Sequence, residues 1–191
     1  MALFLVGLIG FLAIHLAHAL VPGLRAGMIS KLGEMGWKGV YALLSLVFFV
    51  LLIMGYPAAQ SSTVVFAEPP TFLKHLNLLF SPIALILAVA GSLPRGFMTK
   101  YLKHPQLVGV KLWALGHLLA NWDLTSIILF GSFLAWAVIV RISIKKRPVV
   151  EPKAPSALWD GIAVIAGGAI TGWIFMGGHV MMTGLAPVPG M

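Results

Sequence analysis

The 191-residue sequence contains no cysteine and only five acidic residues. Without cysteine the chain cannot form disulfides, thiolate-held zinc sites, iron–sulfur clusters or a covalent haem attachment through CxxCH. The scarcity of aspartate and glutamate argues against hydrolysis by paired carboxylates and against ion pumping through buried acids. HExxH and Walker motifs are also absent from the sequence. Neutral histidine is therefore the strongest ligand type that remains for a metal or a haem.

Charge of either sign is scarce, because charged residues make up 9% of the chain and hydrophobic residues 60%. Soluble domains carry roughly a quarter charged residues, so this composition predicts a polytopic membrane protein. The formal net charge is +8, but the basic residues fall in short clusters between apolar runs. That distribution is typical of residues that determine membrane topology and does not indicate a nucleic-acid partner.

Six stretches approach the length of about 20 apolar residues that a membrane-spanning helix requires. They cover residues 2–21, 39–58, 74–93, 105–121, 122–140 and 157–184. We therefore predict an all-α bundle of about six transmembrane helices, in a single domain over residues 1–191. The first stretch has no basic segment before it and no clean cleavage site after it, so it is interpreted as a retained helix and not as a signal peptide. The fourth and fifth stretches are separated by Asn121-Trp122-Asp123, which predicts a tight helical hairpin.

Basic residues concentrate in three of the predicted loops. Eleven of the thirteen lysines and arginines lie there, namely Arg25, Lys31, Lys38, Arg95, Lys100, Lys103, Arg141, Lys145, Lys146, Arg147 and Lys153. The positive-inside rule places such loops in the cytoplasm. We expect a multi-pass protein of the bacterial inner membrane with both termini on the periplasmic side.

The connection after the first predicted helix, PGLRAGMISKLGEMGWKG, has a pattern of its own. Leu24, Met28 and Leu32 follow helical spacing, while Arg25 lies off that stripe. This pattern predicts a short amphipathic helix at the membrane interface. The alternative is that the first helix continues past Pro22 into the cytoplasm.

Histidines inside predicted spans are functional candidates, because ionisable groups are costly in a bilayer. His15 and His18 lie three residues apart in the first span and therefore share a helix face. His117 lies deep in the fourth span, beside Gly116, whose missing side chain would admit a flat ligand or another helix. His179 in the last span follows two glycines and is a further candidate.

Two other polar residues occur near the start of the fourth span. His104 precedes Pro105, a favourable first position of a helix, so it is interpreted as an interfacial residue. Lys111 lies one to two turns further in. It could extend its amine to the interface, pair with Asp160 or Glu34, or hold an anionic group of a ligand.

Two histidines from different helices that face an apolar slot form the ligand set of a bis-histidine b-type haem. Neutral imidazole is a good iron ligand, and the porphyrin requires apolar surroundings. Arg25, Tyr41 or Lys111 could meet the haem propionates. The residues alone therefore permit a haem site.

A series of short motifs extends over about residues 1–140. The first run comprises His15, Arg25, Lys31-Leu32-Gly33-Glu34, Trp37-Lys38-Gly39, Tyr41, Ser45-Leu46 and Gly55-Tyr56. The second comprises His104-Pro105, Gly109, Trp113, Leu115, His117, Asn121 and Leu129-Phe130-Gly131. In these motifs the chain resembles the NnrU family of bacterial membrane proteins, most specifically in the pattern HP(x)3G(x)3W(x)3H. The last predicted span, 157–184, lies outside the resemblance.

The NnrU family is similar to the plant 15-cis-zeta-carotene isomerase, an integral membrane enzyme with b-type haem, and in bacteria it is associated with denitrification. The resemblance implies haem b held by a histidine of the first helix and by His117. The bacterial spacing to Arg25 selects His15, and the plant spacing selects His18. The plant enzyme has a cysteine where this chain has Ala114, so a switch to a thiolate ligand is not expected here.

The predicted topology offers a second ligand pair. If the first helix ends near residue 21, His15 lies about 12 Å from the depth of His117 at 1.5 Å per residue. His179 is nearer to the depth of His117, so this pair is an alternative to His15 with His117.

Two functions follow as hypotheses. The first is a haem-b membrane protein with a redox role or a carotenoid cis–trans isomerase role, acting on a carotenoid or another apolar molecule. The second is a non-enzymatic accessory factor for respiratory nitrogen-oxide enzymes that reduce nitrite or nitric oxide, with histidines that are only structural. In both cases the lipid bilayer is the surrounding partner.

Overall fold

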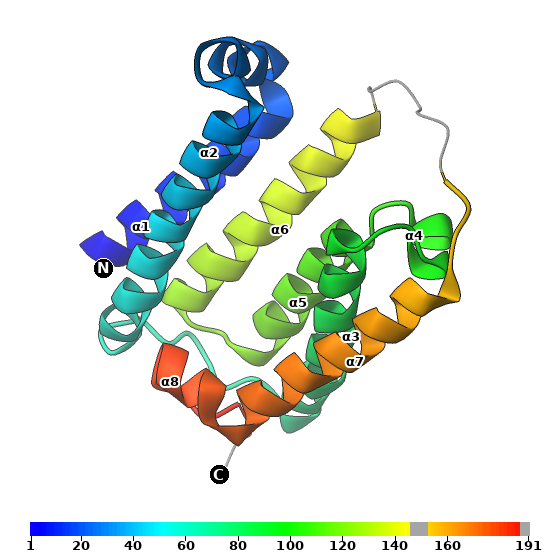
Figure 1. Ribbon diagram of the computed structural model, residues 1–191. Coiled ribbons are helices and arrows are strands. Elements are labelled where there is room, and N and C mark those ends of the chain that lie inside the picture. Colours follow the sequence, from blue (N-terminus) through cyan, green and yellow to red (C-terminus); the bar gives the residue numbers. More distant parts are fainter. Residues whose placement is uncertain (146–152, 188–191) are drawn as a thin grey trace. The chain divides into compact units, whose positions relative to one another are not determined.

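The structure is a computed structural model that describes residues 1–145 and 153–187. Over these residues it is helical and contains no β-strand, apart from one isolated backbone bridge between Val65 and Asp123. The α-helices, labelled in Figure 1, are α1 (Ala2–Leu20), α2 (Pro22–Gln60), α3 (Thr71–Ser92), α4 (Phe97–Leu102), α5 (Pro105–Ala120), α6 (Leu124–Lys145), α7 (Ala157–Trp173) and α8 (His179–Thr183). The π-helix η1 (Ile174–Gly178) lies between α7 and α8. The predicted all-α class is confirmed.

Four helical stretches in the described part of the chain are long and apolar enough to cross a membrane. They are Gly23–Gln60, Thr71–Ser92, Leu124–Lys145 and Ala157–Thr183. The apolar stretch Ala2–Ala17 of α1 is shorter. Helix α5 has 16 residues, so at 1.5 Å per residue it measures about 24 Å, against about 30 Å for a hydrocarbon core. The membrane class is supported, and the count of six spans stays a prediction.

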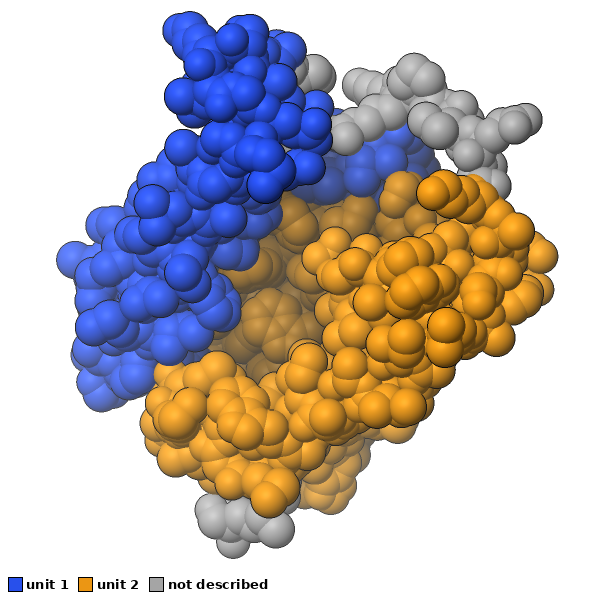
Figure 2. Space-filling view, in the orientation of Figure 1, with its two compact units in different colours: residues 1–63, 138–147 blue, residues 64–137, 148–191 orange. Residues whose placement is uncertain are grey.

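The chain folds into two compact units, each of which is described by itself (Figure 2). Unit 1 contains Met1–Thr63 and the end of α6 from Val138 onwards, and unit 2 contains Val64–Ala137 and the chain from Lys153 onwards. The predicted single domain over residues 1–191 stays a prediction.

In unit 1, α1 and α2 approach each other at two glycines. A Cβ atom added to Gly7 would collide with the backbone of Leu52, and one added to Gly55 would collide with the backbone of Phe4. Lipid gives no hydrophobic force between helices, so close van der Waals contact between backbones is the main source of their association. Glycine at both positions is what permits that contact.

Helix α2 is interrupted at Gly33, which has φ +71° and ψ 169°. This left-handed φ is accessible to glycine without a steric penalty. The preceding helix α1 ends at Leu20, Val21 is not helical, and Pro22 occupies the first turn of α2. A separate short helix therefore precedes Gly33, as the pattern predicts, and the alternative that α1 continues past Pro22 is wrong.

In unit 2, α3 is packed against α5 and α7. A Cβ atom on Gly109 of α5 would lie 2.6 Å from the carbonyl oxygen of Ala84, and one on Gly167 of α7 would lie 2.7 Å from the Cα atom of Ile86. Both contacts are to the backbone of α3, which cannot move aside as the end of a flexible side chain can. Glycine thus sets the distance of both neighbours from α3.

The short helix α4 was not among the predicted elements. Its N-terminal amides are capped by the carboxylate of Asp160 in α7, which accepts hydrogen bonds from the backbone N–H groups of Phe97 at 2.6 Å and Met98 at 3.0 Å. The helix ends at Lys103, whose φ is +63°. Asp160 therefore acts as a cap that ties α7 to the loop between α3 and α5.

The predicted hairpin between α5 and α6 is present. Asn121 follows the last residue of α5 and its N–H bonds the carbonyl of His117 at 2.9 Å, while the carboxylate of Asp123 accepts from the N–H of Ser126 at 2.9 Å at the start of α6. The loop before α3 lies beside this turn, because Phe66 donates to the carbonyl of Trp122 at 2.9 Å.

The last predicted span, 157–184, is not one regular helix. Helix α7 ends at Trp173, and η1 contains Gly177 with a φ of +125° before α8 begins at His179. A π-helix that contains a glycine with this φ redirects the chain, so His179 does not continue the helical register of α7. Of the basic loop residues, Lys146 and Arg147 lie outside the described residues.

We expect Gly167→Ala to destabilise unit 2, because its Cβ meets the α3 backbone at 2.7 Å. Forcing this contact should cost about 1–3 kcal/mol of unfolding free energy. The matched control is Gly168→Ala, where nothing lies within 4 Å of the added atom and better helix propensity should leave stability equal or raise it by up to about 1 kcal/mol. Denaturant titration of the detergent-purified variants measures both, and equal effects would contradict the packing described.

Candidate functional site

The imidazole of His117 is held by two neighbours in unit 2, Trp113 and Phe130. Its Nδ1 lies 2.8 Å from the carbonyl oxygen of Trp113, one turn earlier in α5. Its ring stacks on Phe130 of α6 with centroids 4.4 Å apart and planes at 24°, and its centroid lies 5.3 Å from that of Trp113. The ring is therefore fixed in position and orientation by both a hydrogen bond and a stack.

The hydrogen bond also decides the tautomer of His117. A carbonyl oxygen can only accept, so Nδ1 must carry the proton and donate. In the neutral imidazole this leaves the lone pair on Nε2. No hydrogen-bond partner of Nε2 is found in the described part of the chain. Nε2 is thus a candidate metal-ligating atom.

Aromatic side chains from α6 surround this part of α5. Trp113 makes edge-on contacts with Phe130 at 4.9 Å and with Phe133 at 5.4 Å. Trp113 and His117 share a helix face because they are four residues apart. The environment of His117 is consequently flat, apolar and rigid.

His15 has the same local arrangement in unit 1. Its Nδ1 lies 2.7 Å from the carbonyl oxygen of Phe11, so Nδ1 again carries the proton. The ring stacks on Phe11 with centroids 4.1 Å apart and lies 5.5 Å from the ring of Tyr41. The ring of Tyr41, expected near the cofactor, is therefore a neighbour of His15. The side chain of His18, the alternative in α1, lies outside what the structure describes.

His179, at the start of α8, is the third histidine with this tautomer. Its Nδ1 lies 2.7 Å from the carbonyl oxygen of Leu185 and 3.1 Å from the hydroxyl of Thr183. His179 and His117 both belong to unit 2. Whether they form the alternative ligand pair stays a prediction.

Lys111 and Arg25, the cationic candidates for contact with haem propionates, are placed less favourably than the histidines. Lys111 is six residues before His117, which turns it about 120° around α5, so the two side chains do not leave the same face. No carboxylate lies within 4.0 Å of Lys111 among the described residues, since Glu34 pairs with Lys38 at 2.9 Å and Asp160 caps α4. Arg25 is exposed in the first turns of α2. Their predicted contact with haem propionates stays a prediction.

His104 is the N-cap residue of α5, directly before Pro105, which agrees with its interpretation as a residue at the helix start. Gly116 faces another helix and not a ligand, because a Cβ atom there would meet the side-chain amide of Asn77 in α3. Ala114, where the plant enzyme has cysteine, is fully buried.

Among the described residues no group of three or more histidine, cysteine, aspartate or glutamate side chains could together hold a metal ion. A haem differs in this respect, because the porphyrin supplies four ligands and the protein supplies only one or two axial ones. The neutral Nε2 atom of His117 in aromatic surroundings fits such an axial role.

Sequence reasoning missed the aromatic partners Phe11, Phe130 and Phe133. A signal for one of them exists, because His15 follows Phe11 by four positions and His117 follows Trp113 by four positions. The stack of Phe130 on His117 could not be anticipated, since it depends on how α6 returns along α5.

Comparison with protein families gives a match over nearly the whole chain. The family model described as NnrU protein matches residues 3–187, and the match extends through α7 and α8, beyond the residues that carry the motif resemblance. No curated protein and no solved structure matches the chain. Since the family model covers nearly all of the sequence, this chain belongs to the NnrU family.

Proposed function

We propose that this NnrU-family membrane protein binds b-type haem and that His117 is one of its axial ligands. The observation that carries the proposal is the hydrogen bond from Nδ1 of His117 to the carbonyl of Trp113 at 2.8 Å. Ligating histidines in proteins almost always donate their other ring N–H in this way, which orients the ring and makes the ligating nitrogen more basic. The stacked ring of Phe130 adds a fixed apolar wall.

His15 is the proposed second ligand. It repeats the bond from Nδ1 to the carbonyl four residues earlier and the stack on an aromatic ring. His179 is the alternative, since it lies in the same unit as His117. Its Nδ1 is also bonded to a carbonyl, so it too would offer Nε2.

Bound haem would supply electron transfer or, where one axial position is open, a coordination site for an apolar substrate. Ala114 provides no side-chain ligand beside His117. An isomerase role therefore requires a histidine that can leave the iron, whereas a redox role requires only that both histidines stay. We propose the redox role as the simpler use of these residues.

We expect detergent-purified protein from haem-replete cells to show the reduced-minus-oxidised spectrum of six-coordinate b haem. His117→Ala should lose the spectrum, because it removes Nε2 from the stacked site. His75→Ala is a matched control, since His75 is exposed at the start of α3, and it should retain full haem. A colourless wild-type protein would overturn the proposal and favour an accessory role with structural histidines.

The second ligand can be identified with the same spectra. His15→Ala should convert the six-coordinate spectrum to a five-coordinate or haem-poor one, while His179→Ala should leave it unchanged. The reverse result would assign His179 as the partner of His117. Rescue of a carotenoid-producing strain blocked at the cis-zeta-carotene step would show isomerase activity in addition to haem binding.

The membrane orientation is also proposed, with the basic loops in the cytoplasm of a bacterium and both termini in the periplasm. The chain has no cysteine, so no native cysteine has to be replaced before single-cysteine variants are made. Lys100→Cys in α4 and Ser62→Cys after α2 replace exposed residues on the two predicted sides. In intact cells with a permeable outer membrane, an impermeant maleimide should label Ser62→Cys and spare Lys100→Cys. Labelling in the opposite sense would invert the proposed topology.

A further inference from the structure

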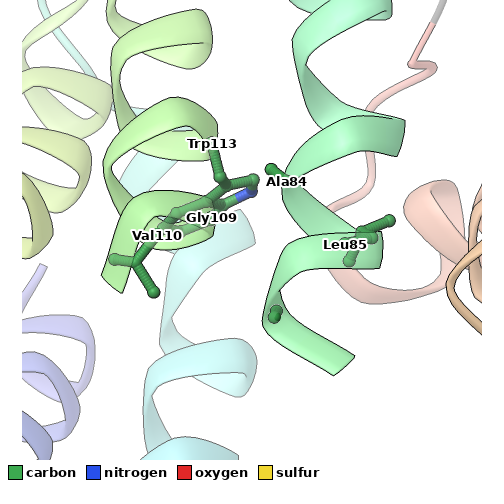
Figure 3. Close-up of a pocket in the computed structure, with 6 residues that line it drawn as sticks. Ala84, Leu85, Gly109, Val110 and Trp113 are labelled. Carbon is green, nitrogen blue, oxygen red and sulfur yellow. The ribbon is translucent and has the colours of Figure 1, made fainter. Parts of the chain in front are cut away.

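A small cavity lies between α3 and α5 in unit 2. Its volume is about 160 Å³, and it is lined by Ala84, Leu85, Ala88, Gly109, Val110 and Trp113 (Figure 3). The pocket is partly open to its surroundings, and its volume is about that of an engineered closed cavity that binds benzene. Two alanines and Leu85 form the α3 side of the lining.

The indole N–H of Trp113 is the single polar side-chain group among the six lining residues. Figure 3 shows the nitrogen-bearing edge of the ring turned towards Ala84 across the cavity. Nε1 makes no hydrogen bond to any described residue, since the contacts of Trp113 are the aromatic ones and the bond that its carbonyl accepts.

An unpaired N–H is costly at this place. Trp113 is the ninth of the 16 residues of α5, so it lies about 10–12 Å from either helix end. The side chain of Trp113 is half-buried, and the bilayer interior offers no water to bond its N–H. An occupant that carries an acceptor oxygen into the cavity would satisfy this donor.

The depth and size of the cavity restrict that occupant. The ester carbonyls of phospholipids lie in the interfacial region, outside the hydrocarbon core, and so do not reach the middle of α5. A hydrocarbon chain could fill the space but offers no acceptor. A flat six-membered ring with carbonyl groups fits the volume and supplies the acceptor, and an isoprenoid tail allows such a ring to reside within the membrane.

We propose that this cavity binds the ring of an isoprenoid quinone, with the Trp113 N–H as donor to one ring carbonyl. Ala84 and Ala88 receive the face of the ring, and Gly109 leaves the space for it. The inference uses residues of unit 2 that are not candidate haem ligands, and it holds whether or not haem is bound.

The experiment is a titration of the full-length protein in detergent with a short-chain benzoquinone, followed by isothermal calorimetry. An alkylbenzene of similar size is the second probe. We expect the quinone to bind more tightly than the alkylbenzene. Trp113→Phe keeps an aromatic ring but removes the donor, so it should weaken quinone binding about 3- to 10-fold, the usual value of one hydrogen bond, and leave the alkylbenzene unchanged.

Two further variants make the test specific. Trp159→Phe on α7 removes an indole that does not line the cavity, and it should bind quinone as the wild type does. Ala88→Leu fills the cavity and should abolish binding of both probes. Equal affinity for the two probes, or an unchanged quinone affinity in Trp113→Phe, would overturn the inference and leave a cavity filled by any apolar group. Equal quinone binding by haem-free protein is expected, so a colourless preparation would contradict only the haem proposal.

Discussion

Close backbone contact between helices is the constraint on which unit 2 depends. In a bilayer the apolar side chains gain nothing by leaving lipid for protein, so helices associate through packing contacts that small residues permit. Gly109 and Gly167 bring α5 and α7 onto the backbone of α3. The α3–α5 contact in turn holds Trp113 beside the alanines of α3 and leaves the small cavity between them. A helix spaced further out by larger residues would lose both features.

The same apolar environment also determines how the histidine side chains form their hydrogen bonds. A polar ring inside the membrane must satisfy its own hydrogen bonds, and the carbonyl one helical turn earlier is always within reach. His15 and His117 both use Nδ1 for this bond. The bond makes the ring acceptable in an apolar helix, and in His117 it also presents Nε2 as a neutral ligand atom. In His117 a single hydrogen bond from Nδ1 thus both satisfies the polar ring within the helix and leaves Nε2 ready to bind a metal.

Much of the fold could be predicted from the sequence, and less of the site. Apolar runs of the right length gave the principal helices, and Asn121-Trp122-Asp123 gave the turn between α5 and α6. Helix α4 and the interruption at Gly177 were not predicted, because they depend on a cap from Asp160 in α7 and on a local backbone conformation. The candidate histidines were identified, but their aromatic partners were not. Gly116 faces α3 and not a cofactor. The spacing of residues within α5 could not distinguish between these two alternatives.

By itself the sequence determined the class of protein, because 60% hydrophobic residues and no cysteine exclude a soluble fold and thiolate chemistry. It also determined the family, through motifs whose spacing is a property of the chain alone. Only the tertiary structure decided the tautomer of His117, its stack on Phe130 and the unpaired N–H of Trp113. These features depend on where α3 and α6 lie against α5, and contacts between helices distant in sequence are set by packing, which local patterns do not encode.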